Sequence, residues 1–328
     1  MRRREVLMFL GSAAVAVPRR ASAQTAPKTY RVGLLSRGAV IADASPIGGA
    51  LIRALGQRGY SLDRNLAFER RGAEMRVELL PRLVNELVAS KVDVILAVSY
   101  PAALAAKTGT TLPVVVFSTG DPVATGLVDS LARPGGNLTG ISDLTLELSP
   151  KRLQLLKEMT PALRRVAMLW NAADPGMTLR YRASEAAAQV LGITVQPLGV
   201  REFEDFESAF TAMAANKPDA ILIVTDGLTI QNRRRVFDFA ATNQLPALYE
   251  ELDFLVRDGG LMFYGPDTSE LFDRVASLID RILKGAKPKD LPFEQPTRFR
   301  FILNLKAAKA LGLAIPQSIV LRADEVIE

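Results

Sequence analysis

Residues 165–200, RVAMLWNAADPGMTLRYRASEAAAQVLGITVQPLGV, carry the pattern that decides the fold class. The segment joins an apolar run at 166–169, the pair Asp174-Pro175, a stretch with helical periodicity and a β-branched run at 193–195. An Asp whose side chain accepts from free backbone N–H groups, followed by a Pro with a preset φ, is typical of the first turn of a helix. The segment is therefore predicted to form a strand, a helix and a second strand.

The same unit recurs along the chain at a constant spacing. Strand-like runs begin near residues 166, 193, 220 and 247, and each interval of 27 residues suits one strand, one helix and two loops. Similar runs occur at 32–35, 94–98, 114–117 and 261–263. Continuous apolar runs are typical of strands that are covered on both faces, as in parallel sheets. The predicted fold class is α/β.

A turn cluster at 133–137, RPGGN, separates two series of strands. The series define two successive α/β units, roughly 30–145 and 146–265, which are followed by a further helix and a strand-like run at 299–304. Open parallel sheets bind ligands at the carboxyl ends of their strands. Two such sheets side by side predict a ligand cleft between two lobes.

Two helices carry clear end signals. Residues 271–283 place apolar side chains at i, i+4, i+7 and i+8, and Lys284-Gly285 is typical of a helix end. A second helix is predicted to start with Ser149 as its N-cap and Pro150 at its first position.

Residues 1–23 have the three-part plan of an export signal. Arg3-Arg4 belongs to a cationic start, residues 6–17 form an apolar stretch of 12 residues, and Ala-Ser-Ala at 21–23 is a typical cleavage site. Because 12 apolar residues are too short to span a bilayer of about 30 Å, a membrane anchor is the less favoured reading. The paired arginines indicate the twin-arginine route. We expect a periplasmic protein without stable membrane insertion.

The leader also explains most of the positive charge. The chain has 41 Lys plus Arg, 35 Asp plus Glu and a formal charge of +6, but residues 1–23 hold five Arg and one Glu. The basic run 233–235 is flanked by Asp226 and Asp238, so it is interpreted as a solvated helix face. No nucleic-acid partner is expected.

The chain has neither Cys nor His. This composition excludes disulfides, thiolate nucleophiles, Ser-His-Asp triads and metal sites with Cys or His ligands. Neither G-x-G-x-x-G nor G-x-x-x-x-G-K-[ST] occurs, so nucleotide cofactors are not indicated. We expect no cofactor, no metal and no catalytic residues.

Several segments carry a resemblance to a known family, among them the leader and residues 99–107, 151–161 and 281–299. The longest are VVVFSTGDPVATGLVDSLARPGGNLTGIS at 114–142, LPALYEELDFLVRDGGLMFYG at 245–265 and NLKAAKALGLAIPQSIVLRADEVIE at 304–328. The chain resembles the substrate-binding proteins of ABC transporters that are related to the tryptophan and tyrosine transport binding proteins. The resemblance extends from the leader to the C terminus.

The resemblance implies the type I periplasmic binding fold, with two Rossmann-like lobes that close on a small solute. It implies a first lobe of residues 24–145 with about 266–290, and a second of 146–265 with about 291–328. The implied partners are a small solute and the membrane permease of an importer, and the protein is expected to be a monomer. No chemistry on the solute is required.

Candidate ligand contacts follow the strands, where loops at the cleft are expected. Asp226 matches an Asp that faces the ligand amino group in the aromatic amino-acid binders. Purely structural roles remain alternatives to ligand contact: Ser99 as a helix cap, Asp226 as a turn residue, and the tyrosines as core residues. Tyr100 and Gly227 depart from the commoner family pattern. The candidates are Ser36, Ser99, Tyr100, Ser118, Thr119, Asn171, Asp226, Tyr249, Glu250 and Tyr264.

The main functional hypothesis is that the chain is the periplasmic binding component of an ABC importer. Its solute is expected to be an amino acid or a similar small carboxylated compound, and in one version of this hypothesis it is an aromatic compound. One alternative is a periplasmic sensor subunit that signals to a membrane receptor. Another is an exported enzyme that works with carboxylates.

Overall fold

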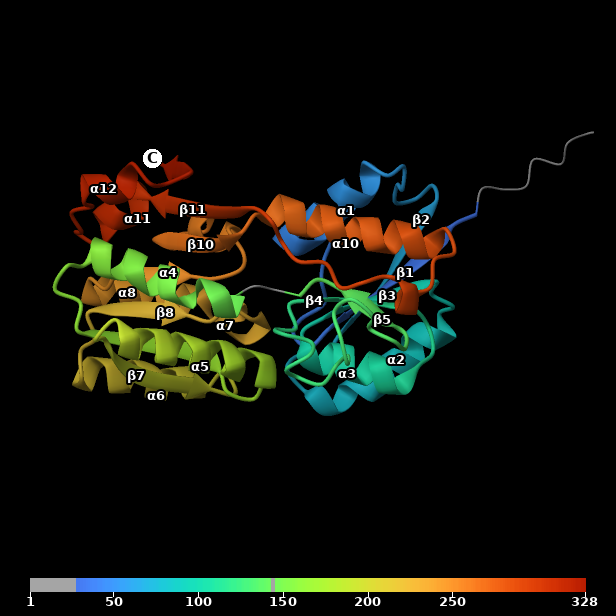
Figure 1. The fold of residues 1–328 in the computed structure, drawn as a ribbon, viewed down its shortest axis with the longest axis horizontal. Helices are drawn as coiled ribbons and strands as arrows, with labels where there is room; N and C mark the ends of the chain where they lie inside the picture. Colours follow the sequence, from blue (N-terminus) through green and yellow to red (C-terminus); the bar gives the residue numbers. More distant parts are fainter. Residues whose placement is uncertain (1–27, 143–144) are drawn as a thin grey trace, which may run out of the picture.

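The two lobes lie end to end along the long axis of the molecule, each built around one sheet (Figure 1). The computed structural model describes residues 28–142 and 145–328. The predicted export signal at 1–23 lies outside these residues. Among the described helices, none has the length and apolar composition needed to cross a bilayer.

The first lobe contains a five-stranded parallel sheet in the order β2-β1-β3-β4-β5. Helices α1 and α10 cover one face, and α2 and α3 cover the other (Figure 1). Its elements are β1 (Tyr30–Ser36), α1 (Pro46–Gly56), β2 (Leu66–Gly72), η1 (Val77–Leu79), α2 (Leu80–Ala89), β3 (Val94–Val98), α3 (Tyr100–Gly109), β4 (Val114–Phe117), β5 (Leu138–Gly140), α10 (Thr268–Leu283) and η2 (Pro288–Asp290).

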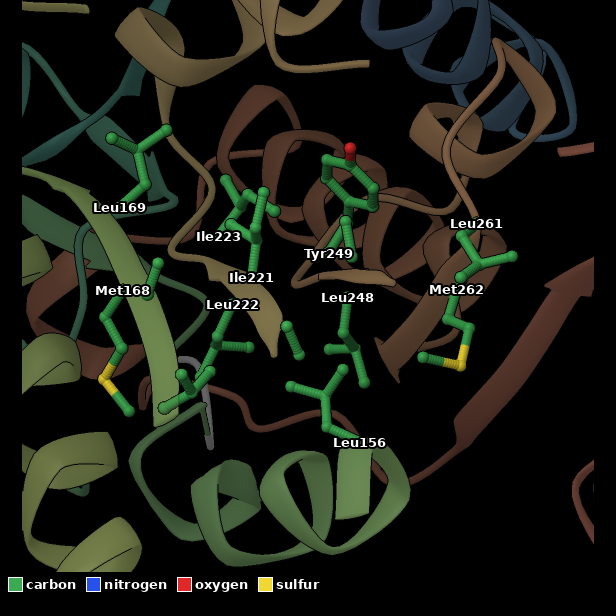
Figure 2. Close-up of a cluster of buried hydrophobic side chains, with 14 of the residues drawn as sticks. Leu156, Met168, Leu169, Ile221, Leu222, Ile223, Leu248, Tyr249, Leu261 and Met262 are labelled. Carbon is green, nitrogen blue, oxygen red and sulfur yellow. The ribbon is translucent and has the colours of Figure 1, made fainter. Parts of the chain in front are cut away.

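The second lobe contains a seven-stranded sheet in the order β12-β11-β10-β9-β8-β6-β7. Its strands form the largest buried apolar cluster, part of which is drawn in Figure 2. Its elements are α4 (Thr145–Met159), β6 (Arg165–Asn171), α5 (Pro175–Val190), β7 (Thr194–Val200), α6 (Asp205–Ala215), β8 (Ala220–Ile223), α7 (Gly227–Gln231), α8 (Arg233–Asn243), β9 (Ala247–Tyr249), α9 (Phe254–Arg257), β10 (Met262–Pro266), β11 (Phe299–Asn304), α11 (Leu305–Ala310), α12 (Gln317–Val320) and β12 (Glu325–Ile327).

The α/β prediction is confirmed, with one antiparallel pair as the exception. β10 and β11 pair antiparallel, whereas every other printed pairing is parallel. The chain leaves the second lobe after β10, forms α10 in the first lobe and then returns as β11 (Figure 1). β11 therefore runs antiparallel to β10.

Helix α10 confirms the apolar pattern at 271–283, and the side chain of Asp267 caps it by accepting from Glu270 N. The predicted start of the helix at Ser149 is wrong, because α4 begins at Thr145 and Pro150 lies inside it. Ser149 is buried and its Oγ accepts a hydrogen bond from Ser184 Oγ at 2.9 Å. The Ser149 hydroxyl, which the local pattern predicted to cap the helix, therefore binds a residue of α5 instead.

A buried ion pair ties α4 to the end of β9. Arg152 Nη1 lies 3.1 Å from Glu250 Oε1, and both side chains are fully buried. Arg152 Nε also donates to the carbonyl oxygen of Tyr264 at 2.9 Å. The pair links three elements of the second lobe.

Removing one partner of this pair should leave the other charge buried. We expect Arg152→Met to lower the free energy of unfolding by about 3–5 kcal/mol, measured by urea denaturation. The control is Arg82→Met on α2, where the exposed pair with Glu86 at 3.6 Å should contribute under about 1 kcal/mol. A loss at Arg152 no larger than the control would contradict the structural role of the pair.

Candidate functional site

The two lobes meet at the carboxyl ends of their strands, around a cavity of about 160 Å³. The first lobe contributes Ser36 after β1, Val98 at the end of β3, and Phe117 and Ser118 at the end of β4. The second lobe contributes Asp226 and Ile230 around α7, among other residues. The cavity therefore lies between the two lobes, largely among segments that follow parallel strands of both sheets.

Three of the sequence-predicted residues line this cavity: Ser36, Ser118 and Asp226. Asn171 does not line the cavity, but it contacts a residue that does: its Nδ2 donates to Asp226 Oδ2 at 2.5 Å. Thr119 is fully buried where the lobes touch. A Cβ atom added to Gly176, in the first turn of α5, would lie 2.6 Å from the Thr119 carbonyl oxygen.

Ser99 and Ser118 have backbone conformations that are unusual for their residue type. Their φ angles are 97° and 57°, in the region that favours glycine. Ser99 precedes α3, yet its side chain makes no capping hydrogen bond, so the cap reading of Ser99 is wrong. Tyr100 is the first residue of that helix. Strained residues at the ends of two neighbouring strands are typical of a binding site.

The other three predicted residues, Tyr249, Glu250 and Tyr264, do not line this cavity. Tyr249 is 2% exposed, packs edge-on against Phe237 at 5.4 Å and lies in the core drawn in Figure 2. Its burial raises the pKa of the hydroxyl above its ordinary value. Glu250 pairs with Arg152, and Tyr264 packs against the same core.

Asp226 has a local role as well as a place in the cavity wall. It caps α7, because Oδ1 accepts from Leu228 N at 3.1 Å and from Thr229 N at 3.0 Å. The Thr229 hydroxyl in turn accepts from Asp226 N at 2.9 Å. The residue thus holds the start of a short helix at the cleft.

Arg37 is a charged residue of the site that the sequence interpretation missed. Its side chain is 5% exposed, and Nη1 lies 4.0 Å from Asp226 Oδ2 across the boundary between the lobes. Its Nε and Nη1 have no hydrogen-bond partner among the described residues. A signal was present, since Arg37 directly follows the apolar run of β1, between Ser36 and Gly38.

Asp174 is a second missed residue, although its cap role was predicted. Its Oδ1 accepts from Gly176 N at 2.9 Å, which confirms it as the N-cap of α5. Burial raises the pKa of this carboxyl to about 6, with a further contribution from the charge of Asp226. Arg37 and the backbone N–H groups of the cap oppose the rise.

The raised pKa makes stability depend on pH in a defined direction. Between about pH 4 and 6 the folded protein keeps a proton on Asp174 that the unfolded chain has released. The contribution of Asp174 to the free energy of unfolding therefore falls as the pH rises through this window, by up to roughly 3 kcal/mol.

We expect Asp174→Asn, which keeps an oxygen for the cap, to gain stability relative to the unmodified protein as the pH rises from 4 to 6. Urea denaturation at several pH values measures the difference. Asp129→Asn, at an exposed position of the first lobe, should leave the profile unchanged. Parallel profiles for Asp174→Asn and the unmodified protein would contradict the assignment.

The chain is similar in sequence to one protein family and to a tyrosine-binding protein. Residues 44–327 match the family model described as ABC transporter substrate binding protein. A tyrosine-binding protein from Clostridioides difficile strain R20291 is 27% identical over 264 residues, which cover 80% of this chain and 75% of that protein.

Two solved structures are similar over nearly the whole chain. A conserved domain protein from Vibrio cholerae has a TM-score of 0.82 at 25% identity, covering 91% of this chain and 100% of that one. An ABC domain in complex with L-Trp, from Streptococcus pneumonia, has a TM-score of 0.80 at 26% identity, covering 92% and 100%.

Proposed function

Since the chain belongs to the ABC transporter substrate binding protein family, we propose that it is the periplasmic binding component of an importer. Its fold is that of the type I periplasmic binding proteins. The family consists of substrate-binding proteins and is not an enzyme family. In the proposal, the protein binds one small carboxylated solute by closure of the lobes and delivers it to a membrane permease.

One observation carries this proposal: buried charged side chains of opposite lobes face each other beside a cavity. Arg37 comes from the first lobe, and Asp226 and Asp174 come from the second. A solute that contacts both lobes favours the closed arrangement, because only that arrangement offers all the contacts at once. The cavity volume of about 160 Å³ suits a solute of amino-acid size.

The solute class is a carboxylic acid, either an amino acid or an aromatic acid. Support comes from the donors at the carboxyl ends of the first sheet, and from the names of the relatives, which state tyrosine and L-Trp as their ligands. The ten predicted contacts remain proposals, and Ser36, Ser118 and Asp226 have the support of lining the cavity.

The proposal also includes the export route and the limits of the two lobes. Residues 1–23 would direct the chain through the twin-arginine route, and the mature protein would act as a monomer. The first lobe would comprise 24–145 with about 266–290, which is supported by the packing of α10 against α1. The second would comprise 146–265 with about 291–328, which is supported by the place of β11 in the second sheet.

A thermal-shift panel of amino acids, amides and aromatic acids tests solute binding. A ligand at 100 times its Kd should stabilise the folded protein by about 2.7 kcal/mol, which raises the midpoint of unfolding. If no compound of these classes raises the midpoint, the proposed solute class is wrong.

The contact between Thr119 and Gly176 provides a test of closure. Gly176→Ala places a Cβ 2.6 Å from the Thr119 carbonyl oxygen of the other lobe, so the closed arrangement is disfavoured while each lobe stays folded. We expect at least a tenfold loss of affinity for the best compound of the panel, by isothermal titration calorimetry. The midpoint of unfolding without solute should stay unchanged or rise slightly, because Ala is the better helix residue.

Gly56→Ala is the matched control, since a Cβ at this helical position meets nothing within 4 Å. This variant should bind like the unmodified protein. Equal affinities for Gly176→Ala and the unmodified protein would contradict binding by closure.

A further inference from the structure

The guanidinium of Arg37 is a buried cation whose hydrogen-bonding capacity is largely unused. A guanidinium carries five N–H donors, and two of its nitrogens, Nε and Nη1, have no hydrogen-bond partner among the described residues. The nearest carboxylate oxygen, Asp226 Oδ2, is 4.0 Å from Nη1, which is too far for a hydrogen bond. Buried charges are stable when they are paired and hydrogen-bonded. A planar anion with two oxygens matches this group.

Asp226, in contrast, has little capacity left for a ligand ammonium group. A carboxylate has about four acceptor positions. Oδ1 already accepts from the backbone N–H groups of Leu228 and Thr229, and Oδ2 accepts from Asn171 Nδ2. The remaining side of Oδ2 faces Arg37. Asp226 therefore fixes α7 and balances the charge of Arg37.

Two hydroxyl groups add donors at the same edge of the first sheet. Ser99 Oγ and Thr119 Oγ1 are buried and have no hydrogen-bond partner in the part of the chain that the structure describes. Strands β1, β3 and β4 are adjacent in the sheet, and Arg37, Ser99 and Thr119 follow their carboxyl ends. One lobe thus supplies a cation and two hydroxyls at neighbouring strand ends, which suits a carboxylate.

Arg37, Ser99 and Thr119 do not line the cavity themselves, but each directly follows a lining residue, Ser36, Val98 and Ser118 respectively. The cavity that these neighbours line has a mainly apolar wall. Val98, Phe117, Ile230 and Leu252 line it, and the polar lining residues, which include Ser36, Asp226 and Glu251, are the minority. The carboxylate of Glu251 is paired with Arg180, whose Nη1 lies 2.8 Å from Glu251 Oε2. An apolar wall next to a buried cation matches a solute with an apolar body and one anionic head.

From these observations we propose that the solute is an apolar, and in particular aromatic, monocarboxylic acid without an α-amino group, and that Arg37 binds its carboxylate. The inference rests on the proposed solute-binding function and narrows it. It also changes the expected role of Asp226, from partner of a ligand ammonium to counter-charge of Arg37.

Matched pairs of compounds test the proposal by isothermal titration calorimetry on the purified protein. The pairs are 3-phenylpropionate with phenylalanine, 3-(4-hydroxyphenyl)propionate with tyrosine, and indole-3-propionate with tryptophan. The members of a pair differ only in the α-amino group. We expect the acid of the best pair to bind at least tenfold more tightly than its amino acid.

Variants of Arg37 link this preference to the site. Arg37→Gln should weaken the acid at least tenfold, and Arg37→Lys should weaken it less, because the charge is kept while bidentate hydrogen bonding is lost. Arg37→Lys also serves if Arg37→Gln fails to fold. Arg82→Gln on the exposed face of α2 is the control and should bind like the unmodified protein.

The pH dependence of binding gives an independent readout. Asp174 is faced by Asp226 and Arg37, and an added anion next to them favours its protonated form. The affinity for the acid should therefore rise as the pH is lowered from 7.5 to 5.5. An ammonium ligand bound at Asp174 would show the opposite trend.

The proposal is overturned if any amino acid binds as tightly as its acid, or if Arg37→Gln leaves the affinity for the acid within twofold. It is also overturned if none of the six compounds binds. Such a failure leaves the proposed function to be judged separately, because the thermal-shift panel also contains amides and amino acids outside the three pairs, and Gly176→Ala is tested with the best compound of that panel.

Discussion

The structure depends on how charge is buried where its two lobes meet. Arg37 of the first lobe faces Asp226 and Asp174 of the second, and all three side chains are at least nine-tenths buried. Burial of an ion costs several kcal/mol unless partners compensate. Each lobe alone would expose its charges to water, so in the proposed function a solute or counter-charge that matches them favours closure. Solute binding and closure are therefore coupled in this account.

The parallel sheets explain why these groups converge. The strands β1–β5 of the first lobe are parallel, and so are β6–β10 of the second, so the loops and helix starts that follow them lie together at one edge of each sheet. Only β11 and β12 of the described strands run the other way. Asp174 and Asp226 cap α5 and α7, so the residues that bring charge to the cleft are the ones that hold the helix starts in place. Positions that cap helices at the cleft can therefore affect both stability and binding.

The sequence was sufficient for the α/β class and for most of the strands, because buried parallel strands are read directly from apolar runs. It missed β2, β5 and β12, which lie in segments without a continuous apolar run. It also identified Ser36, Ser118 and Asp226 as lining residues, since each follows a strand. It could not separate them from Glu250, which also follows a strand but is buried against Arg152 of α4. Where a side chain points and which residue it contacts depend on tertiary packing, which the local sequence does not specify. For the same reason the sequence did not reveal that Arg37 is buried at the boundary between the lobes.

The most direct test of the central claim is a crystal structure of the protein purified with the solute it retains. The account predicts a carboxylate within hydrogen-bond distance of Arg37, with the apolar part of the solute against Val98 and Phe117 between closed lobes. A solute bound elsewhere, or one whose ammonium group is held by Asp226 while Arg37 does not touch it, would contradict the account.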